Sequence, residues 1–137
     1  MTGILVVTHA DLGKALIETL EFILNEKVEK ILAVSIDIRE SPETLRNKIK
    51  KGIKKVKDDD GVIIFTDMFG GTPSSLSYSL LEEGVVEVIS GVNLPTLLKA
   101  VNIRTQMEIS KAVEQIVATG KRSISLATAI LKGDKRL

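Results

Sequence analysis

Short apolar runs rich in β-branched residues alternate along the chain with longer segments of helical period, and this alternation restricts the fold more than any other feature. The runs are Ile4–Val7, Ile31–Val34, Val62–Phe65 and Val85–Ile89. This alternation is typical of a parallel α/β sheet, in which helices connect successive strands. The first and third runs are apolar on both faces, as central strands covered by helices are. The sequence therefore predicts an α/β fold with a doubly wound, mostly parallel sheet in the flavodoxin-like order 2-1-3-4.

The segments between these runs carry apolar residues at helical spacing, which predicts helices on both faces of the sheet. The predicted helices are 12–24, 42–56, 73–81, 94–101 and 109–119. Ser41 is the expected N-cap of the second helix, with Pro42 at its first position, and Gly120 is the expected C-terminal cap of the last. The lysines of the second helix lie opposite its apolar stripe, so we expect a solvated face rather than a binding patch.

The C-terminal segment has a period of two instead of a helical period. Ile124, Leu126 and Ile130 fall on one face, and small or polar residues fall on the other. This pattern predicts a C-terminal edge strand. Because the link at 120–122 is short, the strand either pairs with its own sheet or is exchanged with a second subunit in a dimer.

Length and composition exclude several classes of protein. The chain has 137 residues, which suits a single domain over 1–137. It has no cysteine, which excludes disulfides, thiolate metal sites and cysteine nucleophiles. With 19 basic against 18 acidic residues and 3% aromatic residues, neither charge nor base stacking favours nucleic-acid binding. No apolar stretch approaches the roughly 20 residues of a transmembrane helix, and no signal peptide is evident, so we expect a soluble cytoplasmic protein.

Two residues able to act together in catalysis follow the two central strands. His9, the only histidine, comes directly after the first run, and Asp67 comes just after the third. In the predicted strand order these strands are neighbours, so both side chains should face one crevice at the carboxyl edge of the sheet, where open α/β sheets bind ligands. A carboxylate bonded to one imidazole nitrogen leaves the other nitrogen free as a nucleophile. The pair therefore predicts a nucleophilic histidine oriented by an acid.

The segment after Asp67 predicts a site for an anion beside His9. Gly70 and Gly71 allow close approach of the backbone to a ligand, and Thr72 is the expected N-cap of the helix that follows. Free amides at a helix N-terminus, together with the hydroxyl of Thr72 or Ser74, can hold a phosphoryl group. The alternative is that this segment is only a strand-to-helix turn.

Other phosphate and hydrolase motifs are missing from the sequence. There is no GxxxxGK P-loop, no GxGxxG turn after the first strand, and no acidic cluster typical of a magnesium-dependent kinase. There is also no GxSxG turn to expose a serine nucleophile. These absences leave histidine chemistry as the leading hypothesis.

Three segments in this order along the chain form a recognisable combination: Ile4–His9, Gly61–Ser74 and Ile89–Pro95. Together they resemble the enzyme IIA domain of the mannose family of the bacterial phosphoenolpyruvate-dependent sugar phosphotransferase system. The resemblance implies a cytoplasmic α/β domain that accepts a phosphoryl group on His9 from the histidine-containing phosphocarrier protein and passes it to a histidine on enzyme IIB. Enzyme IIB then phosphorylates sugar that enters through membrane permease subunits.

The resemblance also implies roles for the site residues. Asp67 matches the carboxylate that orients the histidine, and Gly71 and Thr72 match the segment that receives the phosphoryl oxygens. No metal or bound cofactor is required for the transfer, and the family is typically homodimeric with an exchanged C-terminal strand. Ala10 and Ser75 depart from the residues frequent in the family, so neither is given a role.

Two alternatives use the same histidine. One is a regulatory module whose phosphorylation state is read by another protein without a dedicated transporter. The other is the phosphoryl-donor subunit of a dihydroxyacetone kinase, which shares this type of domain. An apolar rim of Met68, Phe69 and Leu94 is either a docking surface for partners or ordinary packing.

Overall fold

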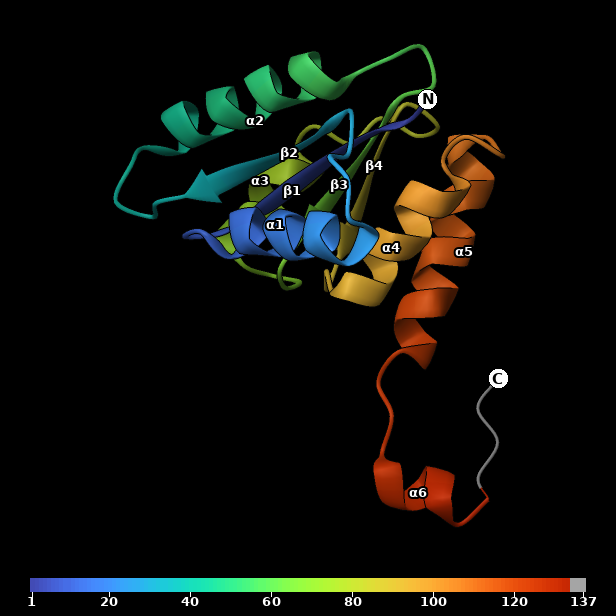
Figure 1. The fold of residues 1–137 in the computed structure, drawn as a ribbon. Helices are drawn as coiled ribbons and strands as arrows, with labels where there is room; N and C mark the ends of the chain where they lie inside the picture. The colour runs from blue at the N-terminus through green and yellow to red at the C-terminus, as the bar shows by residue number, and fades with distance from the viewer. Residues whose placement is uncertain (134–137) are drawn as a thin grey trace.

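One parallel sheet forms the centre of the computed structural model, which describes residues 1–133 (Figure 1). Its strands are β1 (Gly3–His9), β2 (Ile31–Ile36), β3 (Val62–Thr66) and β4 (Val86–Ser90). The order is β2-β1-β3-β4 and each neighbouring pair is parallel, which confirms the predicted 2-1-3-4 arrangement. The apolar β1 and β3 are therefore central, as predicted. The last residues of the predicted domain, 134–137, lie outside the described residues.

Helices cover both faces of the sheet (Figure 1). One face carries α1 (Leu12–Leu24), α4 (Leu94–Ile103) and α5 (Ile109–Arg122), and the other carries α2 (Pro42–Val56) and α3 (Thr72–Tyr78). Side chains of β1 alternate between the two cores: Ile4 and Val6 join the first, while Leu5 and Val7 join the second. All four are fully buried. The doubly wound prediction is confirmed, and the carboxyl ends of the central strands open together at one edge.

Helix α2 begins where the sequence predicts. The Ser41 hydroxyl accepts a hydrogen bond from Thr44 N at 3.2 Å, and Pro42 is the first helical residue. Leu45, Ile49 and Val56 are buried, while the lysines that follow Ile49 are exposed. The solvated lysine face is therefore confirmed. Within residues 1–133, no helix is long and apolar enough to cross a membrane.

Gly120 does not cap α5, and that prediction is wrong. The helix continues to Arg122, and Ser123 is its C-cap. A Cβ at position 120 would lie only 2.8 Å from Thr96 Cγ2. Gly120 is therefore better explained by the close approach of α5 to α4 than by the end of the helix.

The predicted C-terminal edge strand is also wrong for the described chain. The segment after α5 runs away from the sheet and forms the short helix α6 (Ala127–Leu131) (Figure 1). Alanine and leucine favour a helix, and the segment does not lie against a sheet edge that would impose an extended backbone. Leu126 and Leu131 are 67% and 86% exposed. Exchange of this segment with a second subunit stays a prediction.

Candidate active site

His9 and Asp67 lie in contact at the carboxyl edge of the sheet. His9 is the last residue of β1, and Asp67 directly follows β3, which pairs with β1 in parallel. His9 Nδ1 lies 2.8 Å from Asp67 Oδ2, and the backbone N–H of His9 donates to the same oxygen at 2.9 Å. The structure thus brings together the two residues that sequence reasoning paired across the chain.

The surroundings of Asp67 keep its carboxyl group ionised. Burial acts to raise the pKa of Asp67, but hydrogen bonds from the His9 amide and ring, the charge of His9 and the Met68 amide together lower the pKa below its model-compound value of 3.8. An ionised carboxylate only accepts hydrogen bonds, so His9 Nδ1 carries the shared proton. In the neutral imidazole the lone pair then lies on Nε2. The His9 side chain is 41% exposed and Asp67 only 12%, so the imidazole is accessible to solvent while the carboxylate is sheltered.

The turn after His9 is fixed by its buried neighbour Thr8. The Thr8 hydroxyl accepts a hydrogen bond from Gly13 N at 2.8 Å, which ties the first turn of α1 to the end of β1. Between them, Ala10 has φ of 47°, a left-handed conformation that a residue with a Cβ adopts at some cost. The backbone is thus held in a sharp turn directly beside the imidazole.

Gly71, rather than the predicted Thr72, is the N-cap of α3, and Thr72 is the first helical residue. A Cβ at Gly71 would lie 3.0 Å from His9 Cε1 and 3.7 Å from Nε2. The chain therefore enters α3 so close to the imidazole that a side chain at this position would crowd it. Gly70, with φ of 85°, supplies the left-handed turn that leads into this approach.

The predicted hydroxyl residues of this segment lie in different surroundings. Thr72 is exposed at the start of α3, whereas Ser74 is 1% exposed. Ser74 Oγ lies 3.1 Å from Ser90 Oγ at the end of β4. Gly71 therefore approaches His9 directly, while Ser74 is bonded behind the loop. Sequence reasoning gave no role to Ser90, whose only signal was its place in the segment Ile89–Pro95 that carries the family resemblance.

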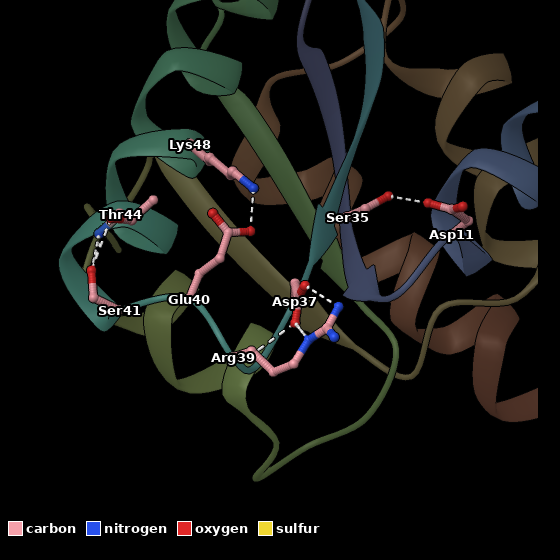
Figure 2. A network of polar contacts seen from close by, with 8 residues as sticks. All are labelled: Asp11, Ser35, Asp37, Arg39, Glu40, Ser41, Thr44 and Lys48. Carbon is pink, nitrogen blue, oxygen red and sulfur yellow. Dashed lines mark hydrogen bonds and ion pairs between the residues drawn. The ribbon is translucent and has the colours of Figure 1, made fainter.

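A groove of about 560 Å³ opens beside His9 on the side of β2. Its wall includes the loop after β2, in which Arg39 donates to both oxygens of Asp37 at 3.0 and 2.9 Å (Figure 2). Arg39 lowers the pKa of Asp37 to about 2. Lys48 of α2 pairs with Glu40 in the same loop (Figure 2). The groove leaves His9 open to solvent on this side, and no motif in the sequence pointed to it.

Metal ligands are not gathered at this edge. In the part of the chain that the structure describes, no three His, Cys, Asp or Glu side chains come together in a way that could hold a metal ion. These residues provide an imidazole that Asp67 holds in one orientation, with the backbone of Gly71 close to its ring.

Comparison with known proteins gives a consistent assignment. The family model described as "PTS system fructose IIA component" matches residues 3–117. The fructose-specific EIIA component of Bacillus subtilis is 26% identical over 133 residues, covering 96% of this chain and 90% of that protein. The sorbose-specific EIIA component of Lacticaseibacillus casei is 32% identical over 115 residues, covering 83% of this chain and 82% of that protein.

A solved structure shares the fold. The phosphotransferase system component EIIA from Streptococcus agalactiae superposes with a TM-score of 0.83 at 23% identity, covering 94% of this chain and 99% of that one. At this level of identity the likeness concerns the fold alone. It agrees with the four-stranded parallel sheet and its helical layers.

Proposed function

The chain belongs to the family of fructose- and mannose-type IIA components of the sugar phosphotransferase system, and on this premise we propose that it accepts a phosphoryl group on His9 and passes it to enzyme IIB. Members of this family are phosphotransferases. The proposed donor is the phosphorylated histidine-containing phosphocarrier protein, and the proposed acceptor is a histidine on enzyme IIB. The membrane permease is reached only through enzyme IIB.

The observation that carries the proposal is the bond between His9 Nδ1 and Asp67 Oδ2 at 2.8 Å. The Nε2 lone pair of His9 attacks phosphorus, a bond from Nε2 to phosphorus forms, and the bond from phosphorus to the donor imidazole breaks. The electron pair of that broken bond stays on the donor nitrogen. In the second step the acceptor imidazole attacks the same phosphorus, and the pair returns to Nε2 of His9. The Nδ1 proton stays between His9 and Asp67, whose negative charge stabilises the phosphorylated imidazole.

We assign phosphoryl binding to Gly70, Gly71, Thr72 and Ser74, the first three at the phosphoryl group itself and Ser74 as their support behind the loop. The close approach of Gly71 to Cε1 and Nε2 of His9 supports this role, because backbone amides there can meet a phosphoryl group on Nε2. Thr72 is exposed beside them and offers its hydroxyl to the phosphoryl oxygens. Ser74 is buried, so its contribution is to hold the first turn of α3.

Donor and acceptor must both reach the same imidazole, so they dock in turn around the carboxyl edge. Met68 and Phe69 are 56% and 75% exposed in the loop after Asp67, and Leu94 is half-buried at the start of α4. Exposed apolar side chains beside a reactive group are typical of protein interfaces. We propose that this rim and the groove beside His9 form the docking surface.

Three further properties come from the family. The chain acts as a single domain over 1–137, it works in the cytoplasm where its phosphocarrier partner is found, and it forms a homodimer in which the C-terminal segment is exchanged. The exposure of Leu126 and Leu131 supports the dimer, because such side chains gain stability when a partner covers them.

The proposal is tested by reconstituting the relay. Purified protein incubated with phosphoenolpyruvate, enzyme I and the phosphocarrier protein should gain one acid-labile phosphoryl group by intact-protein mass spectrometry. Adding an enzyme IIB of the mannose family from the same organism should then remove the group. Protein that stays unmodified with an active donor system contradicts the proposal. If the phosphorylated protein delivers the group only to a dihydroxyacetone kinase, the kinase alternative is favoured. If it is phosphorylated but delivers the group to no enzyme IIB, the regulatory alternative is favoured.

Substitution of Gly71 by alanine should slow phosphorylation at least about tenfold, because the new Cβ crowds the His9 ring and the reacting atoms tolerate little displacement. The backbone φ of −84° at Gly71 suits alanine, so the free energy of unfolding should change by less than about 1 kcal/mol. Rates are measured by quenched-flow phosphorylation. Ser75→Ala, in an exposed position of the same helix, is the matched control. Equal rates for Gly71→Ala and wild type would refute the close-approach argument.

A further inference from the structure

A single hydroxyl at the end of β4 meets three other hydroxyl groups. Thr66 Oγ1 donates to Ser90 Oγ at 2.8 Å, Ser74 Oγ lies 3.1 Å away, and the Tyr78 hydroxyl lies 3.4 Å away. A serine hydroxyl has one donor and two acceptor positions. Three partners therefore use its full capacity, with Ser90 donating to either Ser74 or Tyr78 and accepting from the others.

The three partners lie on the two sides of the loop that faces His9, one before it and two after it in the sequence. Thr66 directly precedes Asp67, while Ser74 and Tyr78 lie in the first and last turns of α3. Thr66 and Ser74 are buried, so their bonds to Ser90 are sheltered from competing water. Ser90 thus joins both ends of the segment 66–78, which carries Asp67 and Gly71 between them.

Backbone hydrogen bonds from the two residues after Ser90 also hold the end of β3. The amides of Gly91 and Val92 both donate to the carbonyl oxygen of Thr66 at 3.0 Å. The end of β4 is therefore attached to the end of β3 through main chain and side chain together. The hydroxyl of Ser90 extends this attachment across to α3 through its bonds to Ser74 and Tyr78.

We propose that Ser90 is a positioning residue for phosphoryl transfer, acting through Ser74 and Thr66 to fix the distance between the Gly71 backbone and His9. The inference rests on the proposed function of His9 and deepens it. Ser90 touches none of the reacting atoms. Its effect arises because a displacement of about 1 Å at a reacting centre can cost on the order of a hundredfold in rate.

Three variants test this role. Ser90→Ala removes the hydroxyl, Ser90→Thr keeps it, and Thr66→Val removes one of its partners with little change of volume. Ser41→Ala is the control, since loss of the α2 N-cap costs about 1 kcal/mol of stability without touching this cluster. Single-turnover phosphorylation by the phosphorylated phosphocarrier gives the maximal rate and the half-saturating donor concentration for each protein.

Ser90→Ala should lower the maximal rate about 10-fold to 100-fold and leave the half-saturating concentration within about twofold, because it removes no side chain of the docking surface. Thr66→Val should give a smaller loss in the same direction. Ser90→Thr should stay within about threefold of wild type, and Ser41→Ala should equal it. Ser90→Ala at the wild-type rate, or Ser90→Thr as slow as Ser90→Ala, overturns the proposal.

Hydrogen exchange of the α3 amides in 75–78, where Ser75 N donates to the Gly71 carbonyl oxygen at 2.9 Å, separates this proposal from the proposed function. These amides should exchange about tenfold faster in Ser90→Ala than in wild type, and unchanged in Ser41→Ala. If wild type itself takes up no phosphoryl group, the proposed function fails, and the exchange rates still decide whether Ser90 positions the segment. Unchanged exchange in a folded Ser90→Ala protein refutes the positioning role.

Discussion

Replacement of His9 by alanine should leave a folded protein that accepts no phosphoryl group from the phosphocarrier protein. His9 is the only histidine in the sequence, so no second imidazole can take over the transfer. Its side chain is 41% exposed, so its removal should change the free energy of unfolding by no more than about 1 kcal/mol. Intact-protein mass spectrometry after incubation with the donor system gives the result directly.

The control for this loss is a variant in the same groove that spares the imidazole. Ser35 donates to Asp11 on the groove wall, and Ser35→Ala removes that bond without touching His9 (Figure 2). Ser35→Ala should gain one phosphoryl group, as wild type does. An acid-labile phosphoryl group on His9→Ala would show that another residue is the acceptor and would refute the assignment.

The meeting of His9 and Asp67 could be predicted because it depends on topology rather than on detail. Each residue follows a run that is apolar on both faces, and such runs become neighbouring central strands in a doubly wound sheet. The carboxyl ends of parallel strands share one edge. The contact could therefore be predicted although His9 and Asp67 are 58 positions apart in the sequence.

Local sequence rules failed where a distant element decided the conformation. Gly120 reads as a helix cap, but its close approach to Thr96 on the neighbouring helix explains it better. Thr72 reads as an N-cap, but the approach of Gly71 to His9 puts the glycine at that position. The alternation around Leu126 is typical of a strand. A strand forms only where it can pair with a sheet edge, and this segment instead forms the helix α6 away from the sheet.

Hydrogen bonds between side chains of different strands and helices could hardly be predicted from the sequence. The hydroxyls of Ser90 and Thr66 are 24 residues apart, and neither lies in a pattern that marks a hydrogen bond. Arg104 shows the same limit at the other end of the sheet. It is 5% exposed and donates to backbone oxygens of Thr2, Glu29 and Lys30, although an arginine at the end of a helix is usually expected in solvent.

The variant Asp67→Asn should fold but accept a phosphoryl group at least about a hundredfold more slowly than wild type. Oδ2 of Asp67 accepts from the His9 amide and ring, and Oδ1 accepts from Met68 N at 3.0 Å. An asparagine must point its NH₂ group at one of these donors in either orientation. With the NH₂ group toward His9, the imidazole loses the tautomer that leaves Nε2 free, and with it toward Met68, the amide of the loop loses its acceptor. Both orientations lose the charge that stabilises the phosphorylated ring.

Acid titration of stability provides an independent readout of the same carboxylate. Because folding lowers the pKa of Asp67 below 3.8, the ionised group stabilises the fold above about pH 4, and this contribution is lost as pH falls through the folded-state pKa. The urea midpoint of wild type should therefore fall more steeply below pH 4 than that of Asp67→Asn. Glu18→Gln, in an exposed position of α1 outside the groove, is the control for rate. A wild-type transfer rate in Asp67→Asn would mean that His9 needs no carboxylate to orient it.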